Sequence, residues 1–101
     1  MVRPKKKRII QKEPLIAQFS PRGRPGRPDR ADLNLDHYEA IRLTDFIGLD
    51  QEAASKSMGV SQQTFSRILK AGRKRLADGL ILGKIINIKG PKKPSEKGKS
   101  P

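Results

Sequence analysis

The chain of 101 residues contains no cysteine and no tryptophan, and aromatic residues make up only 4% of it. Without cysteine the protein can form neither a disulfide framework nor a thiolate metal site. Its longest apolar stretches, residues 80–82 and 85–86, fall far short of the roughly 20 residues that span a bilayer. The N-terminus also lacks the apolar core of a signal peptide. We therefore expect one small, soluble, cytoplasmic domain that makes no membrane contact.

Recognisable catalytic arrangements are also missing. The one histidine, His37, cannot build a zinc site without other ligands, and its position near the start of a helix predicts a solvated surface residue. No Ser–His, His–Cys or paired-carboxylate motif stands out. The acids of the central region are expected to be helix caps and solvated groups: Asp36, Glu39, Asp45, Asp50 and Glu52. We expect no enzymatic activity, no cofactor and no metal.

What the sequence has in excess is positive charge. The 23 Lys and Arg residues outnumber the ten acids, and the formal net charge is +13. Residues 1–30 carry a net +8, residues 31–60 carry −4, and residues 61–80 and 81–101 carry +4 and +5. A strongly basic small domain favours a polyanionic partner, and nucleic acid is the first candidate. Association with the nucleoid follows from that expectation.

The basic residues outside the centre lie in two tails. Residues 1–30 are interpreted as an arm that either contacts phosphates or is free, and residues 91–101 as a disordered tail. Within the arm, residues 20–30 should be an extended loop, because Pro or Gly fills five of eleven positions. Its segment Pro-Arg-Gly-Arg-Pro is similar to the core of an AT-hook, which lies in the minor groove of A·T tracts. A connector that touches only the backbone is the alternative for Arg22, Arg24 and Arg27.

The domain itself is assigned to residues 31–90, and residues 51–70 within it read as two short helices joined by a tight turn. Asp50 can cap the first helix and Ser61 the second, and Gly59 can supply the left-handed residue that ends the first. Val60 and Phe65 occupy the staple positions around the second cap. This layout is typical of a helix-turn-helix, whose second helix enters the DNA major groove.

One further helix, which precedes the motif, completes the predicted three-helix core, and the second helix of the motif is expected to be long. The preceding helix begins at Asn34 and runs to about Phe46, with Gly48 breaking it. Its apolar rows are expected to pack inward, Phe46 included: Tyr38, Ala40, Ile41, Leu43 and Ile47. The last helix should run from Gln62 to about Leu80. Its core face has helical spacing: Phe65, Ile68, Leu69, Gly72 and Leu76.

The opposite face of the last helix is polar and cationic, as a groove-reading surface requires. Residues near the start of such a helix meet base edges, with glutamine suited to adenine and arginine to guanine. The predicted base contacts are Gln62, Gln63, Ser66 and Arg67. The predicted phosphate contacts are Ser61, Thr64, Lys70, Arg73, Lys74 and Arg75.

Short strands are predicted near both ends of the domain. Residues 84–89 are rich in isoleucine and precede Gly90 and Pro91, so they should form a strand that needs a partner. Residues 8–11 and 15–19, separated by Pro14, are the candidate edge strands. We expect a small β-ribbon beside the helices, with strand exchange between two chains as the alternative. The fold class is thus mainly α, a three-helix core with short strands and basic tails.

Residues 35–90 resemble a small prokaryotic family, DUF134 or UPF0251, related to region 4 of sigma factors. The resemblance is carried by residues 38–43 (YEAIRL), 51–54 (QEAA), 58–61 (MGVS), 64–68 (TFSRI), 83–84 (GK) and 86–90 (INIKG). The opening RPKK of residues 3–6 fits as well. Residues 20–30 fall where relatives are expected to vary. Some relatives place cysteines near the N-terminus, and this chain has none, so a metal or redox role does not carry over.

The resemblance implies sequence-specific binding of double-stranded DNA and transcriptional regulation. The alternative is a sigma-like module that docks on RNA polymerase or another regulator and has only nonspecific DNA affinity. Structured RNA is a weaker candidate, because the three phenylalanines are too scattered to form a stacking platform. The sequence leaves open whether the protein acts as a monomer or a homodimer.

Overall fold

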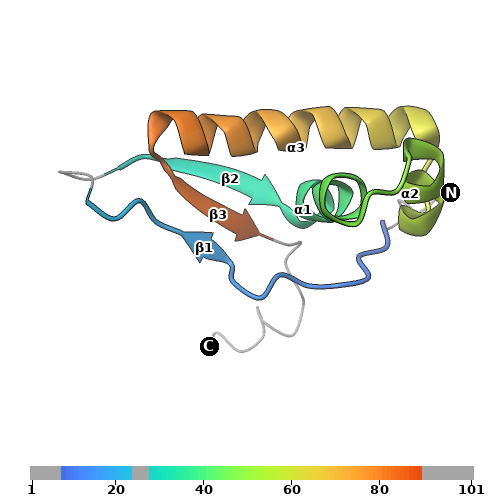
Figure 1. Cartoon of the computed structure of the whole chain (residues 1–101), viewed down its shortest axis with the longest axis horizontal. Coiled ribbons are helices and arrows are strands. Elements are labelled where there is room, and N and C mark those ends of the chain that lie inside the picture. Colours follow the sequence, from blue (N-terminus) through green and yellow to red (C-terminus); the bar gives the residue numbers. More distant parts are fainter. Residues whose placement is uncertain (1–7, 24–27, 90–101) are drawn as a thin grey trace, which may run out of the picture.

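A computed structural model describes residues 8–23 and 28–89. It confirms a mainly α fold with a small sheet near the ends of the domain. The chain runs through β1 (Gln18–Phe19), β2 (Arg30–Asn34), α1 (Leu35–Ile41), the π-helical turn η1 (Arg42–Ile47), α2 (Gln51–Met58), α3 (Gln62–Leu82) and β3 (Ile85–Lys89). Figure 1 shows α3 extending along the whole molecule, with α2 at its N-terminal end and the sheet under its C-terminal half. The described residues contain no helix long and apolar enough to cross a membrane.

The helical core forms where α1, η1 and α2 meet the first half of α3. The three most completely buried large side chains here are Phe65, Leu43 and Met58. They belong to one cluster with Ala40, Ala54, Ile68 and Leu69. Helical spacing predicted the inward face of α3, and the burial of Phe65, Ile68, Leu69 and Gly72 confirms it. The small side chain of Ala54 allows α2 to lie close against α3, and Ala54 is fully buried there.

The turn η1 corrects one prediction about the first helix. The backbone N–H of Gly48 donates to the carbonyl of Leu43, five residues earlier, which is the hydrogen bond of a π-helix. A π-turn holds more residues than an α-turn, so the residues after Leu43 are rotated away from the core stripe. Phe46 is 82% exposed and Ile47 is 49% exposed. Both were predicted to pack inward, and both predictions are wrong.

The sheet has the strand order β1-β3-β2, with the last strand of the chain in its centre. The predicted pairing of residues 15–19 with the C-terminal strand is confirmed within one chain, since Phe19 faces Ile86 in an antiparallel register. The other candidate edge strand, residues 8–11, forms no strand. Its place is taken by β2, which pairs with β3 in parallel. No strand was predicted here: Arg30 was expected to lie in a loop and begins β2 instead, whereas the prediction of Asn34 as the N-cap of the first helix is confirmed.

The helix α3 rests on one face of the sheet because Gly79 allows a close approach. A Cβ atom built at Gly79 would lie 2.5 Å from Ile86 Cγ1 and 3.6 Å from Ala31 Cβ. Ala31, Leu33 and Ile88 are buried on this side. The parallel register places Ala31 beside Ile86 and Leu33 beside Ile88, so the four side chains form one apolar strip under α3.

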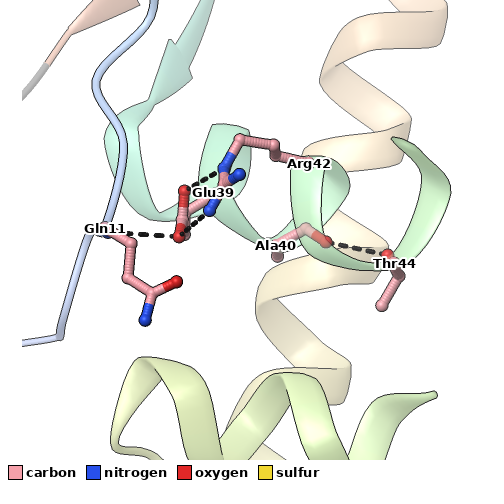
Figure 2. A network of polar contacts seen from close by, with 5 residues as sticks. All are labelled: Gln11, Glu39, Ala40, Arg42 and Thr44. Carbon is pink, nitrogen blue, oxygen red and sulfur yellow. Dashed lines mark hydrogen bonds and ion pairs between the residues drawn. The ribbon is translucent and has the colours of Figure 1, made fainter. Parts of the chain in front are cut away.

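The segment of residues 8–11 packs against α1 and α2 although it was assigned to the arm. Ile9 N–H donates to the carbonyl of Met58 (3.0 Å), and Gln11 N–H donates to Oε2 of Glu39 (3.2 Å). Figure 2 shows that the same carboxylate receives two hydrogen bonds from Arg42, from Nε at 2.8 Å and from Nη2 at 2.9 Å. Glu39 is completely buried, so its prediction as a solvated residue is wrong.

His37 is also buried, with 8% of its surface exposed, and its prediction as a surface residue is wrong. The cause is Gly72 of α3, which faces it. A Cβ atom at Gly72 would lie 2.9 Å from His37 Cβ, so α1 and α3 touch at this point. Nδ1 of His37 accepts a hydrogen bond from Asn34 N–H (3.2 Å), which ties the imidazole to the start of α1.

Candidate nucleic-acid interface

The two helices α2 and α3 are joined by a turn that their own capping residues define. Oδ1 of Asp50 accepts a hydrogen bond from Ala53 N–H (2.8 Å) at the start of α2. Gly59 ends α2 with a φ of 68°, a left-handed conformation that suits glycine. Oγ of Ser61 accepts from Thr64 N–H (3.1 Å) at the start of α3. All three capping predictions are confirmed, and together they fix where α3 begins.

The first turns of α3 present the predicted base-contacting residues to solvent. The side chains of Gln63, Ser66 and Arg67 lie on the face of the helix away from the buried Phe65 and Ile68, and Gln62 is exposed in the first turn. The exposed residues are Gln62, Gln63, Ser66, Arg67 and Lys70. Within residues 8–23 and 28–89, neither Arg67 nor Lys70 forms an ion pair. This part of α3 therefore offers amide, hydroxyl and cationic groups that are available to a ligand.

The side-chain hydroxyls of Ser61 and Thr64, at the start of α3, already form hydrogen bonds within the protein. Besides its capping bond, Ser61 donates from Oγ to Oγ1 of Thr64 (3.0 Å). Thr64 is half-buried, whereas Ser61 is exposed. Ser61 is thus a confirmed cap, and phosphate contact by either residue stays a prediction. The exposed N–H groups at this helix end still favour an anion.

The three cations further along α3 differ from Arg67 and Lys70 because each has a protein partner. Arg73 makes a two-pronged contact with Asp45 of η1, with Nη2 2.7 Å from Oδ1 and Nε 3.1 Å from Oδ2. Lys74 Nζ lies 2.9 Å from Oδ1 of Asp78. Arg75 donates from Nη1 to the backbone carbonyl of Asp32 (2.8 Å) on β2. All three were predicted to contact phosphate, and the structure shows what they contact within the protein.

These ion pairs shift the titration of their carboxylates. The hydrogen bond from Arg73 lowers the pKa of Asp45, and the hydrogen bond from Lys74 lowers the pKa of Asp78. The hydrogen bond from Asp45 correspondingly raises the pKa of Arg73. Both pairs therefore stay ionised and neutral in sum at physiological pH, so among the described residues Arg67, Lys70 and Arg75 are the cations of α3 that no carboxylate balances.

The contact between Arg75 and β2 has a structural role that sequence reasoning missed. In the parallel pairing with β3, Ile85 N–H donates to the carbonyl of Asp29, so Asp32 directs its own carbonyl to the outer edge of β2. Arg75 occupies that carbonyl, and His37 accepts the N–H of Asn34 on the same edge. The outer edge of β2 is thus partly blocked to another strand.

The remaining predicted contacts belong to residues 20–30. Arg22 is exposed beside Gly23, whereas Arg24 and Arg27 lie outside the described residues. Among residues 8–23 and 28–89, no group of three or more histidine, cysteine or acidic residues could hold a metal ion.

Comparisons with known proteins give one consistent result. The family described as "Protein of unknown function DUF134" matches residues 1–95. A UPF0251 protein of Chlorobaculum tepidum is 45% identical over 89% of this chain, and one of Syntrophobacter fumaroxidans is 47% identical over 89%. A UPF0251 protein of Methanococcus maripaludis is 42% identical over 87% of the chain.

The chain spans only part of these relatives. It covers 46% of the Chlorobaculum protein, 58% of the Syntrophobacter protein and 68% of the Methanococcus protein. No solved structure matches it. The family match nevertheless extends over nearly the whole sequence, and the identities to these relatives exceed 40%. The chain therefore belongs to the DUF134, or UPF0251, family.

Proposed function

We propose that this protein binds double-stranded DNA in a sequence-specific manner and regulates transcription. In this proposal α2, the turn at Gly59 and α3 act as a helix-turn-helix, and the first turns of α3 enter the major groove. Gln62, Gln63, Ser66 and Arg67 contact base edges. Lys70 and the N-terminal end of α3, at Ser61 and Thr64, contact phosphates.

The observation that carries the proposal is the outer face of the first turns of α3. The helix is anchored by Phe65 and Leu69 in the core, and it exposes two glutamines and Arg67, which forms no ion pair with any residue of 8–23 or 28–89. The width of the major groove, about 12 Å, matches a single helix with its side chains. An arginine and a glutamine in such a position can each form two hydrogen bonds with one base, which discriminates between base pairs by roughly 1–3 kcal/mol.

The charge of the chain supports the same partner. The net charge of +13 supplies a nonspecific attraction to the DNA backbone, and the acidic residues 31–60 contain α1, η1 and α2 rather than α3. Long-range attraction therefore favours an approach in which α3 faces the polyanion.

The test begins with selection of bound duplexes from a random library at near-physiological salt. The selected site is then titrated against scrambled DNA with the double variant Gln63→Ala and Arg67→Ala. We expect a selected site bound at least roughly a thousandfold tighter than scrambled DNA, and a loss of most of that ratio in the variant. The matched control is Gln18→Ala with Arg30→Ala, two exposed strand residues of the same types, which should keep the ratio. An unchanged ratio in the α3 variant would contradict the proposal.

One observation favours a second candidate, a module that docks on RNA polymerase or another regulator. Phe46, Leu80 and Ile81 are 82%, 73% and 75% exposed, and exposed apolar side chains can contribute to a protein interface. Affinity capture of RNA polymerase after nuclease treatment tests this candidate. Binding that survives removal of the DNA would favour it.

A further inference from the structure

The cations of α3 fall into two groups along the helix. Arg67 and Lys70, in the N-terminal half, form no ion pair within the described part of the chain. Arg73 and Lys74, only one turn further on, are both paired with carboxylates. The change occurs between Lys70 and Arg73, a rise of about 4.5 Å along the helix axis. A phosphate backbone lying along α3 would therefore pass Arg67 and Lys70 near the N-terminus of the helix and the paired Arg73 and Lys74 further along it.

The pairing of Arg73 differs from that of Lys74 in its origin. Lys74 and Asp78 are four residues apart on one helix, an arrangement that is common on exposed helices. Asp45 comes from a separate element, 28 residues earlier, and the π-turn η1 places it beside the fourth turn of α3. The Nη2 and Nε atoms of the guanidinium are engaged, with donor-acceptor distances of 2.7 and 3.1 Å. Such a two-pronged contact occupies the edge of the guanidinium that could otherwise bind a phosphate with two hydrogen bonds, and it directs the side chain toward η1.

The position of Arg73 makes this pairing relevant to DNA. Arg73 follows Ser66 by seven residues, so the two side chains lie on the same side of α3, two turns apart. The side chains of Arg73 and Asp45 remain 53% and 41% exposed, so the pair borders the proposed groove-facing surface instead of lying in the core. Without Asp45, an arginine at this position could extend to a backbone phosphate beside the groove.

We infer that Asp45 holds Arg73 away from the DNA backbone and so limits the sequence-independent affinity of the protein for DNA. This inference rests on the proposed DNA-binding function. A backbone contact strengthens binding to every sequence equally, so withholding it leaves a larger share of the binding energy to the base contacts of Gln63 and Arg67. In a chain of net charge +13, the absence of this contact lowers the affinity for nonspecific DNA.

The experiment compares the salt dependence of binding to a random-sequence duplex for the wild type and for Asp45→Asn, in the full chain. Each phosphate contact contributes about 0.9 to the slope of log affinity against log salt. We expect Asp45→Asn to steepen the slope by about 0.9 and to tighten nonspecific binding roughly five- to tenfold near 0.1 M salt. Binding to the selected site should tighten by the same factor, so the ratio between the selected site and random DNA should stay unchanged.

Two variants separate the release of Arg73 from a general change in charge. Asp32→Asn removes an acid of nearly the same side-chain exposure, 42%, which pairs with Lys89 on the sheet. It should leave the slope within about 0.3 of the wild type. Asp45→Asn combined with Arg73→Gln should lose the steepening seen in Asp45→Asn alone. Circular dichroism should show that all variants keep the helical content of the wild type.

The outcomes that overturn the inference are distinct from failure of the proposed function. If Asp45→Asn binds random DNA with an unchanged slope, Arg73 gains no phosphate contact. If it binds more weakly, Asp45 positions Arg73 for DNA instead of withholding it. An equal effect of Asp32→Asn would assign the change to net charge alone. If the wild type binds no duplex at any salt concentration, the proposed function and the inference fall together. Nonspecific binding without a selected site removes sequence-specific reading only.

Discussion

At the scale of single residues, Gly72 sets how closely α1 and α3 approach. A Cβ atom there would lie 2.9 Å from His37 Cβ and 3.2 Å from His37 Cα, so the obstacle includes backbone that cannot rotate away. We expect Gly72→Ala to lower the free energy of unfolding by about 1–3 kcal/mol, despite the better helix propensity of alanine. Urea unfolding followed by circular dichroism measures the change. The neighbouring exposed Ala71→Ser serves as control, and a Gly72→Ala protein as stable as the wild type would contradict the packing described here.

His37 gives the protein a predictable pH dependence. Burial lowers the pKa of His37, and Arg75 and Arg8 act in the same direction, while Asp36 opposes them. The unfolded chain therefore takes up a proton near the ordinary pKa of about 6.5, whereas the folded protein resists it to lower pH. Because the unfolded state binds more protons in that window, stability is highest above pH 6.5 and falls as the pH decreases through it.

The measurement is the urea midpoint at several pH values between 7.5 and 5.5. His37 is the only histidine, so it is the only side chain whose ordinary pKa lies in this range. In His37→Asn, which retains an acceptor for the Asn34 N–H, the midpoint should vary much less with pH. An equal decline in wild type and variant would assign the effect to other groups.

Residues whose role is local could be predicted from the sequence, and residues whose role depends on distant partners could not. Asp50, Gly59 and Ser61 act on their own helix ends, so their spacing was sufficient. Glu39 was predicted to be a solvated acid of the central region, but it is buried and paired with Arg42. Its burial depends on residues 8–11 lying across α1, which no local pattern indicates.

At the scale of elements, η1 explains why two phenylalanines that were both predicted to pack inward differ in burial. Phe65 of α3 is fully buried, whereas Phe46 of η1 is 82% exposed. We expect Phe65→Ala to cost about 3–5 kcal/mol of the free energy of unfolding, the range for a large core side chain. Phe46→Ala should change it by no more than about 0.5 kcal/mol, as is usual for surface positions. Chemical denaturation of both variants tests this, and a comparable loss in Phe46→Ala would mean that the side chain is packed in solution.

The element that sequence reasoning missed altogether is β2. Residues 30–34 contain two charged residues and an asparagine, which disfavour a strand, and they directly precede a helix. Their pairing with β3 joins positions that are 55 residues apart in the chain. Only this parallel partner and the apolar contact of Ala31 and Leu33 with α3 make the strand stable. Both causes are tertiary, so the local sequence could not show them.

At the scale of the whole molecule, the high positive charge opposes folding. The net charge of +13 belongs to a chain of 101 residues, so the compact state brings like charges together. We expect the midpoint of thermal unfolding to rise by several degrees when sodium chloride is increased from about 0.05 to 0.5 M, because the screening length falls to a few ångströms. Differential scanning calorimetry provides the measurement. A falling midpoint would indicate that exposed pairs such as Arg73–Asp45 stabilise the fold more than self-repulsion destabilises it.

The sheet order β1-β3-β2 also has a consequence for how the protein is made. The central strand β3 is the last element of the described chain, so β1 and β2 have no partner until residues 85–89 have been synthesised. The contacts among α1, α2 and the first half of α3 join residues closer in sequence, and such contacts form fastest. During translation the proposed DNA-reading helices can therefore assemble first. The strands then pair and form the sheet against α3 as the final step.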